Sequence, residues 1–138
     1  MKRETHELDV ILVEDDDGHA VLFERACEHA HLPLEIRHVK DLRGMRTELQ
    51  RKLPSVLVMD YLLPDGRSVD NVPNETRLYV LPTILITGFP DDRVKSEARK
   101  VGVRFLIKKS QAGFTQLAKL VYQEAVGQFK FGRICSQG

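Results

Sequence analysis

The sequence predicts a single α/β domain built on a parallel sheet, and three observations lead to this fold class. Short runs of β-branched and aliphatic residues recur five times along the chain. These runs are mostly continuous rather than alternating in hydrophobicity, which is typical of strands covered on both faces. Segments with the helical period of three to four residues lie between them, with short connections. Strand and helix alternating in this way indicate βαβ units and a doubly wound fold with helices on both faces of the sheet.

The individual elements follow from these patterns. Strands are expected at 10–13, 34–39, 56–59, 83–87 and 103–107. An amphipathic helix is expected after the first strand, where one face carries Ala20, Phe23, Ala26, Cys27 and Ala30. The same spacing predicts helices over 42–53, 94–101 and 114–125, after the second, fourth and fifth strands.

The connection after the third strand departs from the pattern because of Pro73. Proline lacks the amide that a helix interior needs, and it disfavours helix in the residue before it. Asn71, Asn74 and Glu75 around this proline also suit a loop. We therefore expect a short or irregular third helix, with one turn restarting at Pro73 as its first helical position.

Composition narrows the class of protein. The 138 residues are about the size of one domain, and 42% hydrophobic with 30% charged residues is an ordinary soluble profile. A net charge of +1 provides no basic field, so nucleic-acid binding is not expected. No run approaches the roughly 18 apolar residues of a membrane span, and two distant cysteines, Cys27 and Cys135, fit a reducing cytoplasm. We place the domain at residues 1–127 and a short C-terminal tail at 128–138. The tail is expected to be a frayed end with Phe129 or Phe131 tucked against the body, and a partner-binding tail is the alternative.

Polar residues gather at the ends of the predicted strands. The first strand is followed by the run Glu14 to Asp17, the third ends in Asp60, the fourth in Thr87 and the fifth in Lys108. Ligands bind beyond the carboxyl ends of the strands in such sheets, so these side chains should converge. Clustered carboxylates repel one another unless a cation neutralises them. A few oxygens at an open loop favour magnesium, which completes its coordination with phosphate oxygens, so the sequence predicts a site for both.

Asp60 is the predicted nucleophile of this site. The apolar run 56–59 before it would hold its carboxylate at the rim of a buried strand. Phosphoryl transfer needs positioning and neutralisation of charge, which a metal, an ammonium and a hydroxyl would supply. Taken singly, each residue has a plainer explanation, since an acidic run is usually a solvated turn and Asp16 or Asp17 could cap the next helix. Their order at four strand ends is what favours a chemical site.

These motifs make the chain similar to the receiver domain of response regulators in two-component signal transduction, the CheY-like superfamily, over about residues 8–127. The resemblance rests on I-L-V-E-D-D at 11–16, V-M-D-Y-L-L-P-D-G at 58–66, L-P-T-I-L-I-T-G at 81–88 and G-V-R-F-L-I-K at 102–108. It implies a flavodoxin-like receiver fold whose five-stranded parallel sheet has the order 2-1-3-4-5. It also implies a phosphoacceptor signalling protein, not a classical enzyme, that loses its phosphate by slow autodephosphorylation.

The resemblance assigns roles to the acidic residues. Asp60 would be the phosphoacceptor and would become a 4-aspartylphosphate. Mg²⁺ would be held by Asp15, by Asp60 and by the backbone carbonyl of Leu62, with Glu14 acting through a water molecule.

Further roles follow around the phosphoryl group. Thr87 would hydrogen-bond it and Lys108 would pair with it. Thr87 would then move inward as a switch, and Phe105, where the family has an aromatic residue, would repack and alter a surface over the fourth helix, fifth strand and fifth helix. Leu62 and Phe89 flank the path of the attacking water, and two apolar side chains there would exclude it and slow hydrolysis. The plainer alternative is that both form an exposed apolar patch for a partner.

The sequence departs from the family at the fifth strand, where Lys109 stands in place of the proline that usually follows the lysine. A non-proline cis bond costs roughly 3 kcal/mol, so this bond could be trans and Lys108 could be placed differently. The departure is the one feature that supports the alternative of a phosphate-independent pseudo-receiver, which would be a binding module. The intact site residues speak against that alternative; they are Glu14, Asp15, Asp60, Thr87 and Lys108. A phosphate-handling enzyme or nucleoside triphosphatase is disfavoured, because the chain has no Gly-rich phosphate loop and Leu62 stands where aspartyl phosphatases carry a second Asp.

The expected partners are a histidine kinase or a histidine phosphotransfer protein as phosphodonor, and an unidentified downstream protein. Direct contact with nucleic acid or membrane is not expected. No output domain is recognisable after residue 127, which implies a single-domain regulator or phosphorelay intermediate that signals through protein contacts. A cytoplasmic location is expected, and a homodimer is left open.

Overall fold

The computed structural model describes residues 8–78 and 80–137, with 128–137 described as backbone only. Strands occupy Asp9–Val13 (β1), Glu35–Val39 (β2), Val56–Asp60 (β3), Leu62–Leu63 (β4), Gly66–Arg67 (β5), Thr83–Thr87 (β6) and Phe105–Lys108 (β7). Helices occupy Asp17–His29 (α1), Leu42–Arg51 (α2), Asn74–Arg77 (α3), Asp92–Lys100 (α4) and Gln111–Gln137 (α5), with a 3-10 turn at Ser68–Asp70 (η2). The five strands expected from the sequence are all present.

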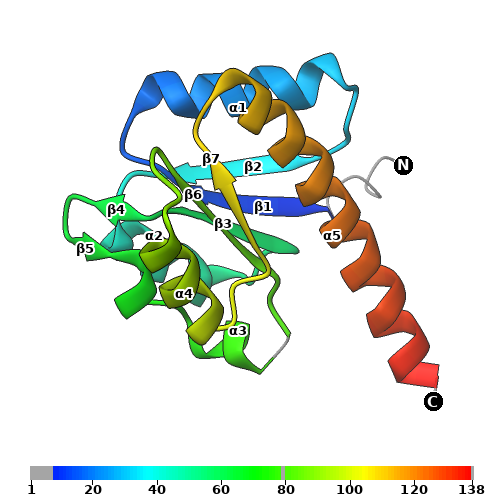
Figure 1. Ribbon diagram of the computed structural model, residues 1–138. Helices are drawn as coiled ribbons and strands as arrows, with labels where there is room; N and C mark the ends of the chain where they lie inside the picture. The colour runs from blue at the N-terminus through cyan, green and yellow to red at the C-terminus, as the bar shows by residue number, and fades with distance from the viewer. Residues whose placement is uncertain (1–7, 79, 138) are drawn as a thin grey trace.

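The large sheet has the order β2-β1-β3-β6-β7, and its neighbouring strands are all parallel. Counted along the chain, this is the order 2-1-3-4-5 of a doubly wound flavodoxin-like fold, so the predicted fold class is confirmed. Helices α1 and α5 cover one face of the sheet, and α2 and α4 cover the other (Figure 1). The central strands β1, β3 and β6 are buried along their whole length, which explains why their sequences are continuously apolar.

The core consists of two layers because successive side chains of a strand point to opposite faces. On β1, Val10 and Leu12 pack with α1 and α5, and Ile11 and Val13 pack with α2 and α4. Phe23 of α1 is fully buried in the first layer. The strand ends that carry the polar residues are therefore held between two packed layers.

Three helices that follow strands begin with an aspartate cap. Asp16 Oδ1 accepts the His19 N–H at 3.1 Å and so caps α1. Asp41 and Asp91 cap α2 and α4 in the same way. Such caps satisfy amides that have no partner within the helix, and they fix the loops that lie between strand and helix at the carboxyl edge of the sheet.

The segment between β3 and β6 is only partly as expected. It begins with a small antiparallel hairpin of β4 and β5, which the sequence did not predict. In its turn, Asp65 accepts hydrogen bonds from the amides of Leu42 at 2.9 Å and Arg43 at 3.1 Å. The third helix is short, as the proline led us to expect, but it begins at Asn74, and Pro73 is its N-cap rather than its first helical residue.

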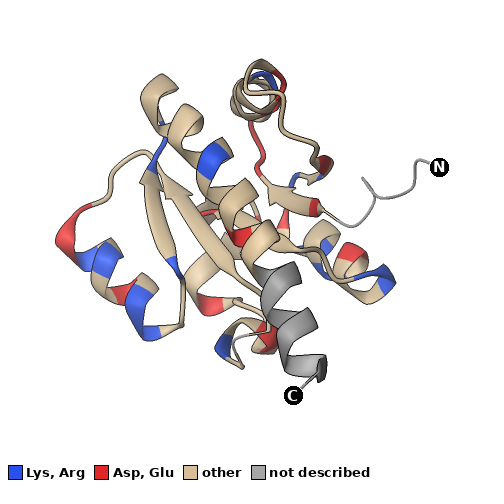
Figure 2. Ribbon diagram, turned by 90° about the vertical axis from the view of Figure 1, so that its right-hand side faces the viewer, with Lys and Arg blue, Asp and Glu red and all other residues tan. Residues whose placement is uncertain are grey.

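Helix α5 continues to Gln137, so the boundary predicted at residue 127 does not mark a break in the helix. The side chains of Phe129 and Phe131 lie outside the described part of the structure. Between residues 111 and 127 only Lys119 and Glu124 are charged, whereas α4 carries charges of both signs along its length (Figure 2). Among the described helices, none combines the length and hydrophobicity needed to cross a membrane.

Candidate functional site

The acidic residues that follow β1 and end β3 come together at the carboxyl edge of the sheet. Glu14, Asp15 and Asp60 each offer a carboxylate oxygen, and these oxygens lie within 4.8 Å of one another. Glu14 and Asp60 are buried, and Asp15 is exposed. The cluster therefore has a closed inner side and an open outer side, and it contains the three carboxylates predicted from the sequence.

Glu14 lies on the closed side, with no solvent exposure. Its Oε2 accepts the backbone N–H of Asp16 at 3.0 Å, and Lys109 Nζ lies 3.2 Å from its Oε1. Burial raises the pKa of Glu14 and the charge of Asp60 raises it further, while the Asp16 hydrogen bond and Lys109 lower it. Burial therefore disfavours the charged form of Glu14, and a cation beside it favours that form.

Lys109 supplies a cation to both buried carboxylates. Its Nζ donates a hydrogen bond to Asp60 Oδ2 at 2.8 Å. Burial alone would lower the pKa of Lys109, but the hydrogen bond to Asp60 and the charges of Asp60 and Glu14 raise it above its usual value. The end of β3 is fixed as well, because the Ser68 hydroxyl donates to the backbone carbonyl of Asp60.

We expected this lysine to be Lys108, and that placement is wrong. Lys108 is the last residue of β7, where it is paired with Thr87, and its side chain is exposed. Neighbouring residues of a strand point to opposite sides, so only one of two adjacent lysines can face Asp60. The backbone N–H of Lys109 donates to the Thr87 carbonyl at 2.8 Å, which sets the side chain of Lys109 toward the site. The peptide bond between the two lysines is trans, since the described residues contain no cis bond.

Thr87 lies at the end of β6, as predicted, and is buried. Its Oγ1 accepts the backbone N–H of Phe89 at 3.2 Å. The side chain of Phe89 is 74% exposed, and that of Leu62 on β4 is 61% exposed. Two apolar side chains thus stand at the surface, one on β4 and one in the loop after β6. This exposure suits the alternative of a partner patch, and exclusion of water by these side chains stays a prediction.

Phe105 is half-buried at the start of β7, and its role as a switch stays a prediction. Phe105 opens β7 and packs against the layer formed by α1 and α5, and the guanidinium carbon of Arg104 lies 5.9 Å from its ring centroid. Leu106 packs against the opposite layer, which contains α4. Counted from Lys109 instead of Lys108, Leu106 occupies the position that we had assigned to Phe105. Leu106 and Phe105 both line the cavity that β7 forms with Lys95, Ala98 and Arg99 of α4.

The donor set of the acidic cluster fits a hard divalent cation. Its members Glu14, Asp15 and Asp60 offer carboxylate oxygens, with no sulfur or imidazole nitrogen in the group. Magnesium prefers such ligands and keeps open positions for water and phosphate oxygens, and the exposed side at Asp15 leaves room for them. The backbone carbonyl of Leu62 as a further ligand stays a prediction.

Comparison with known proteins gives one relative by sequence. No family model matches the chain. The methanogenesis regulatory protein FilR1 of Methanothrix harundinacea is 30% identical over 116 residues, which cover 81% of this chain. The same match covers 26% of FilR1, so the chain spans about a quarter of the length of this relative.

Solved structures provide a closer comparison of the fold. A signal receiver domain of an HD domain-containing protein from Pseudomonas fluorescens matches with a TM-score of 0.76 and 16% identity, over 91% of this chain and 92% of that one. A CheY-like receiver domain protein from Methanospirillum hungatei has a TM-score of 0.74 and 15% identity, over 89% and 97%. The phosphorylated cyanobacterial phytochrome response regulator RcpA has a TM-score of 0.69 and 20% identity, over 84% and 89%. This chain therefore has the fold of the CheY-like response-regulator receiver domains that its motifs resemble.

Proposed function

We propose that this chain is a receiver that takes a phosphoryl group onto Asp60 and thereby switches its contacts with other proteins. The observation that carries the proposal is the position of the Asp60 carboxylate, which is buried at the end of β3 and contacted by Lys109 at 2.8 Å. One of its oxygens also lies within 4.8 Å of carboxylate oxygens of Glu14 and Asp15, close enough for the three residues to share one metal ion. A carboxylate held in this way is a nucleophile with its charge partners already in place.

The reaction that suits this geometry is transfer from a phosphohistidine. An oxygen of Asp60 attacks the phosphorus, and the P–N bond of the donor breaks. The electron pair of that bond stays on the donor's ring nitrogen, so a donor protonated at its second nitrogen leaves as neutral imidazole. Lys109 would move its ammonium from the Asp60 carboxylate to the phosphoryl oxygens, and the Thr87 hydroxyl would donate a hydrogen bond to them.

Magnesium belongs to the same proposal: it would be held by Asp15, Asp60 and the backbone carbonyl of Leu62, with Glu14 acting through a water molecule. When bound, it would neutralise charge on the transferred oxygens. The phosphodonor would be a histidine kinase or a histidine phosphotransfer protein. The partner that responds to phosphorylation would be a downstream protein that contacts the surface of α4, β7 and α5. A cytoplasmic location and a place in a phosphorelay are parts of this proposal too.

Phosphorylation in vitro tests the proposal. The full chain is incubated with acetyl phosphate and Mg²⁺ and weighed intact. We expect the mass of one phosphoryl group on the wild type and none on Asp60→Asn, with loss of the label in base. A folded wild type that takes no phosphate, and is not stabilised by beryllofluoride with Mg²⁺, would favour the pseudo-receiver alternative. A ligand that binds only the folded state must raise the unfolding temperature, so the second readout is independent of the phosphodonor.

A further inference from the structure

Two buried polar atoms beside the acidic cluster face each other without a hydrogen bond. They are Glu14 Oε1 and His19 Nδ1, which lie 3.8 Å apart. This separation is too long for a hydrogen bond. Buried polar atoms nearly always have partners, so this pair points to an interaction that the site makes in another state.

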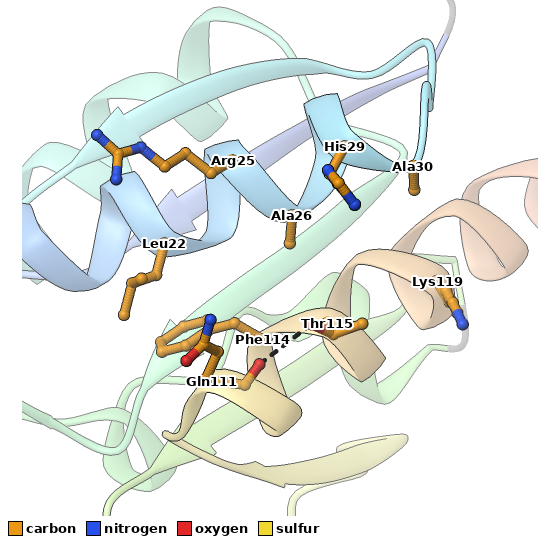
Figure 3. Close-up of a pocket in the computed structure, with 9 residues that line it drawn as sticks. All are labelled: Leu22, Arg25, Ala26, His29, Ala30, Gln111, Phe114, Thr115 and Lys119. Atoms are coloured by element: carbon orange, nitrogen blue, oxygen red, sulfur yellow. Dashed lines mark hydrogen bonds between the residues drawn. The ribbon is translucent and has the colours of Figure 1, made fainter.

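The His19 ring is held in place from two directions. Its backbone N–H donates to the cap residue Asp16 at 3.1 Å, which fixes its place in the first turn of α1. Its imidazole stacks on the ring of Phe114 at 5.8 Å between centroids and 29° between planes. Phe114 projects from α5 into the groove of about 460 Å³ between α1 and α5 (Figure 3). In this position Nδ1 lies 3.8 Å from Glu14 Oε1, while the His19 side chain as a whole is 36% exposed.

We infer that His19 is a positioning residue, whose Nδ1–H donates to Glu14 Oε1 and orients that carboxylate toward the metal ion. The inference rests on the proposed magnesium site. Oε2 of Glu14 is already held by the Asp16 N–H at 3.0 Å. Among the described residues, Oε1 has the Lys109 ammonium at 3.2 Å as its ion-pair partner and no hydrogen bond. A hydrogen bond from His19 to Oε1 would fix this second oxygen as well, so the whole carboxylate would be oriented before any phosphoryl group arrives.

Asp16 is the other carboxylate near the imidazole, with Oδ2 3.9 Å from Nδ1. Its side chain is 54% exposed, against 0% for Glu14. Bulk water can satisfy the exposed oxygens of Asp16, whereas the buried carboxylate of Glu14 depends on partners within the site, so Glu14 is the carboxylate that needs the donor.

Magnesium affinity of the unphosphorylated full chain tests the inference, measured by calorimetric titration after removal of metal. Groups that orient a metal ligand typically change affinity by 10- to 100-fold, so we expect His19→Phe to bind Mg²⁺ about tenfold more weakly. This variant keeps an aromatic ring on Phe114 and lacks the donor. His19→Asn keeps a donor near the position of Nδ1 and should restore most of the affinity. His29→Asn, at the exposed end of the same helix, is the matched control and should bind like wild type.

The order of the variants separates positioning from packing. If the ring of His19 only packs, His19→Phe will bind Mg²⁺ like wild type and His19→Asn will be the weaker one, which would overturn the inference. Thermal unfolding in a chelator shows whether each variant is folded. A wild type that binds no Mg²⁺ would instead refute the proposed function, and the two failures are therefore distinguishable.

Discussion

Replacing Lys109 by methionine should damage both the stability of the fold and its reaction with a phosphodonor. The methionine keeps the length of the side chain and removes its charge. Lys109 is 12% exposed, and its partners Asp60 and Glu14 are 8% and 0% exposed. Removing one partner of a buried ion pair typically costs 3–5 kcal/mol. Because the site opens to solvent at Asp15, we expect about 3 kcal/mol, the lower end of that range.

The assay is thermal unfolding of the full chain in a chelator and again in Mg²⁺. For a chain of this length, about 3 kcal/mol corresponds to a fall of about 10 °C in Tm. Mg²⁺ should restore part of this loss, because a bound dication also neutralises Glu14 and Asp60. The initial rate of phosphorylation by acetyl phosphate should fall by about a hundredfold, the usual cost of removing one group that stabilises developing charge.

Lys108→Met is the matched control, one residue away with an exposed side chain. Its free energy of unfolding should differ from that of wild type by no more than about 0.5 kcal/mol, the effect of an ordinary surface substitution. Its phosphorylation rate should be close to that of wild type. If Lys108→Met were the slow variant and Lys109→Met were normal, the assignment of the site lysine from the structure would be refuted. Equal loss in both would show that the two ammonium groups share the role.

Three further outcomes are expected. Replacing the exposed Leu62 with Asn and Phe89 with Glu should speed loss of the phosphoryl label about tenfold, equivalent to about 1.4 kcal/mol of barrier; equal decay in Mg²⁺ after removal of the donor would show that these side chains do not govern the water. The hydrogen bond from the Leu42 amide lowers the pKa of Asp65, so Asp65→Ala should have a smaller free energy of unfolding in urea than wild type at pH 7. This difference in free energy should shrink as the pH falls below about 4, where the carboxylate becomes protonated. A difference that does not change with pH would exclude the carboxylate as its source. Burial raises the pKa of the Cys27 thiol to about 12, so a thiol reagent at pH 7 should leave Cys27 unmodified until the protein unfolds, and labelling of its peptide in the native state would contradict this.

The fold could be predicted from the sequence because its signals are local. Continuous apolar runs identify strands buried on both faces. The runs at 56–59 and 83–87 form β3 and β6, which end in Asp60 and Thr87. Helical spacing is equally local. The hairpin of β4 and β5 left no such signal, because a pair of two-residue strands is too short to show a period. It depends instead on the turn at Asp65 reaching the amides of α2, a contact between segments far apart in the sequence.

The acidic half of the site was predictable and the basic half was not, for a physical reason. A carboxylate directly after a buried strand has its direction set by that strand, which is why Asp60 lies where the sequence placed it. A lysine has a long flexible side chain, and in Lys108–Lys109 both residues could end the strand. What decides between them is the start of α5, where Ser110 Oγ accepts the Gly113 N–H at 2.9 Å and so fixes the helix cap. Counting back one residue from that cap leads to Lys109. A serine followed three residues later by glycine is a weak cap signal in a sequence. The identity of the site lysine therefore depends on the junction between β7 and α5, which the sequence does not reveal. The variants Lys108→Met and Lys109→Met test this junction directly.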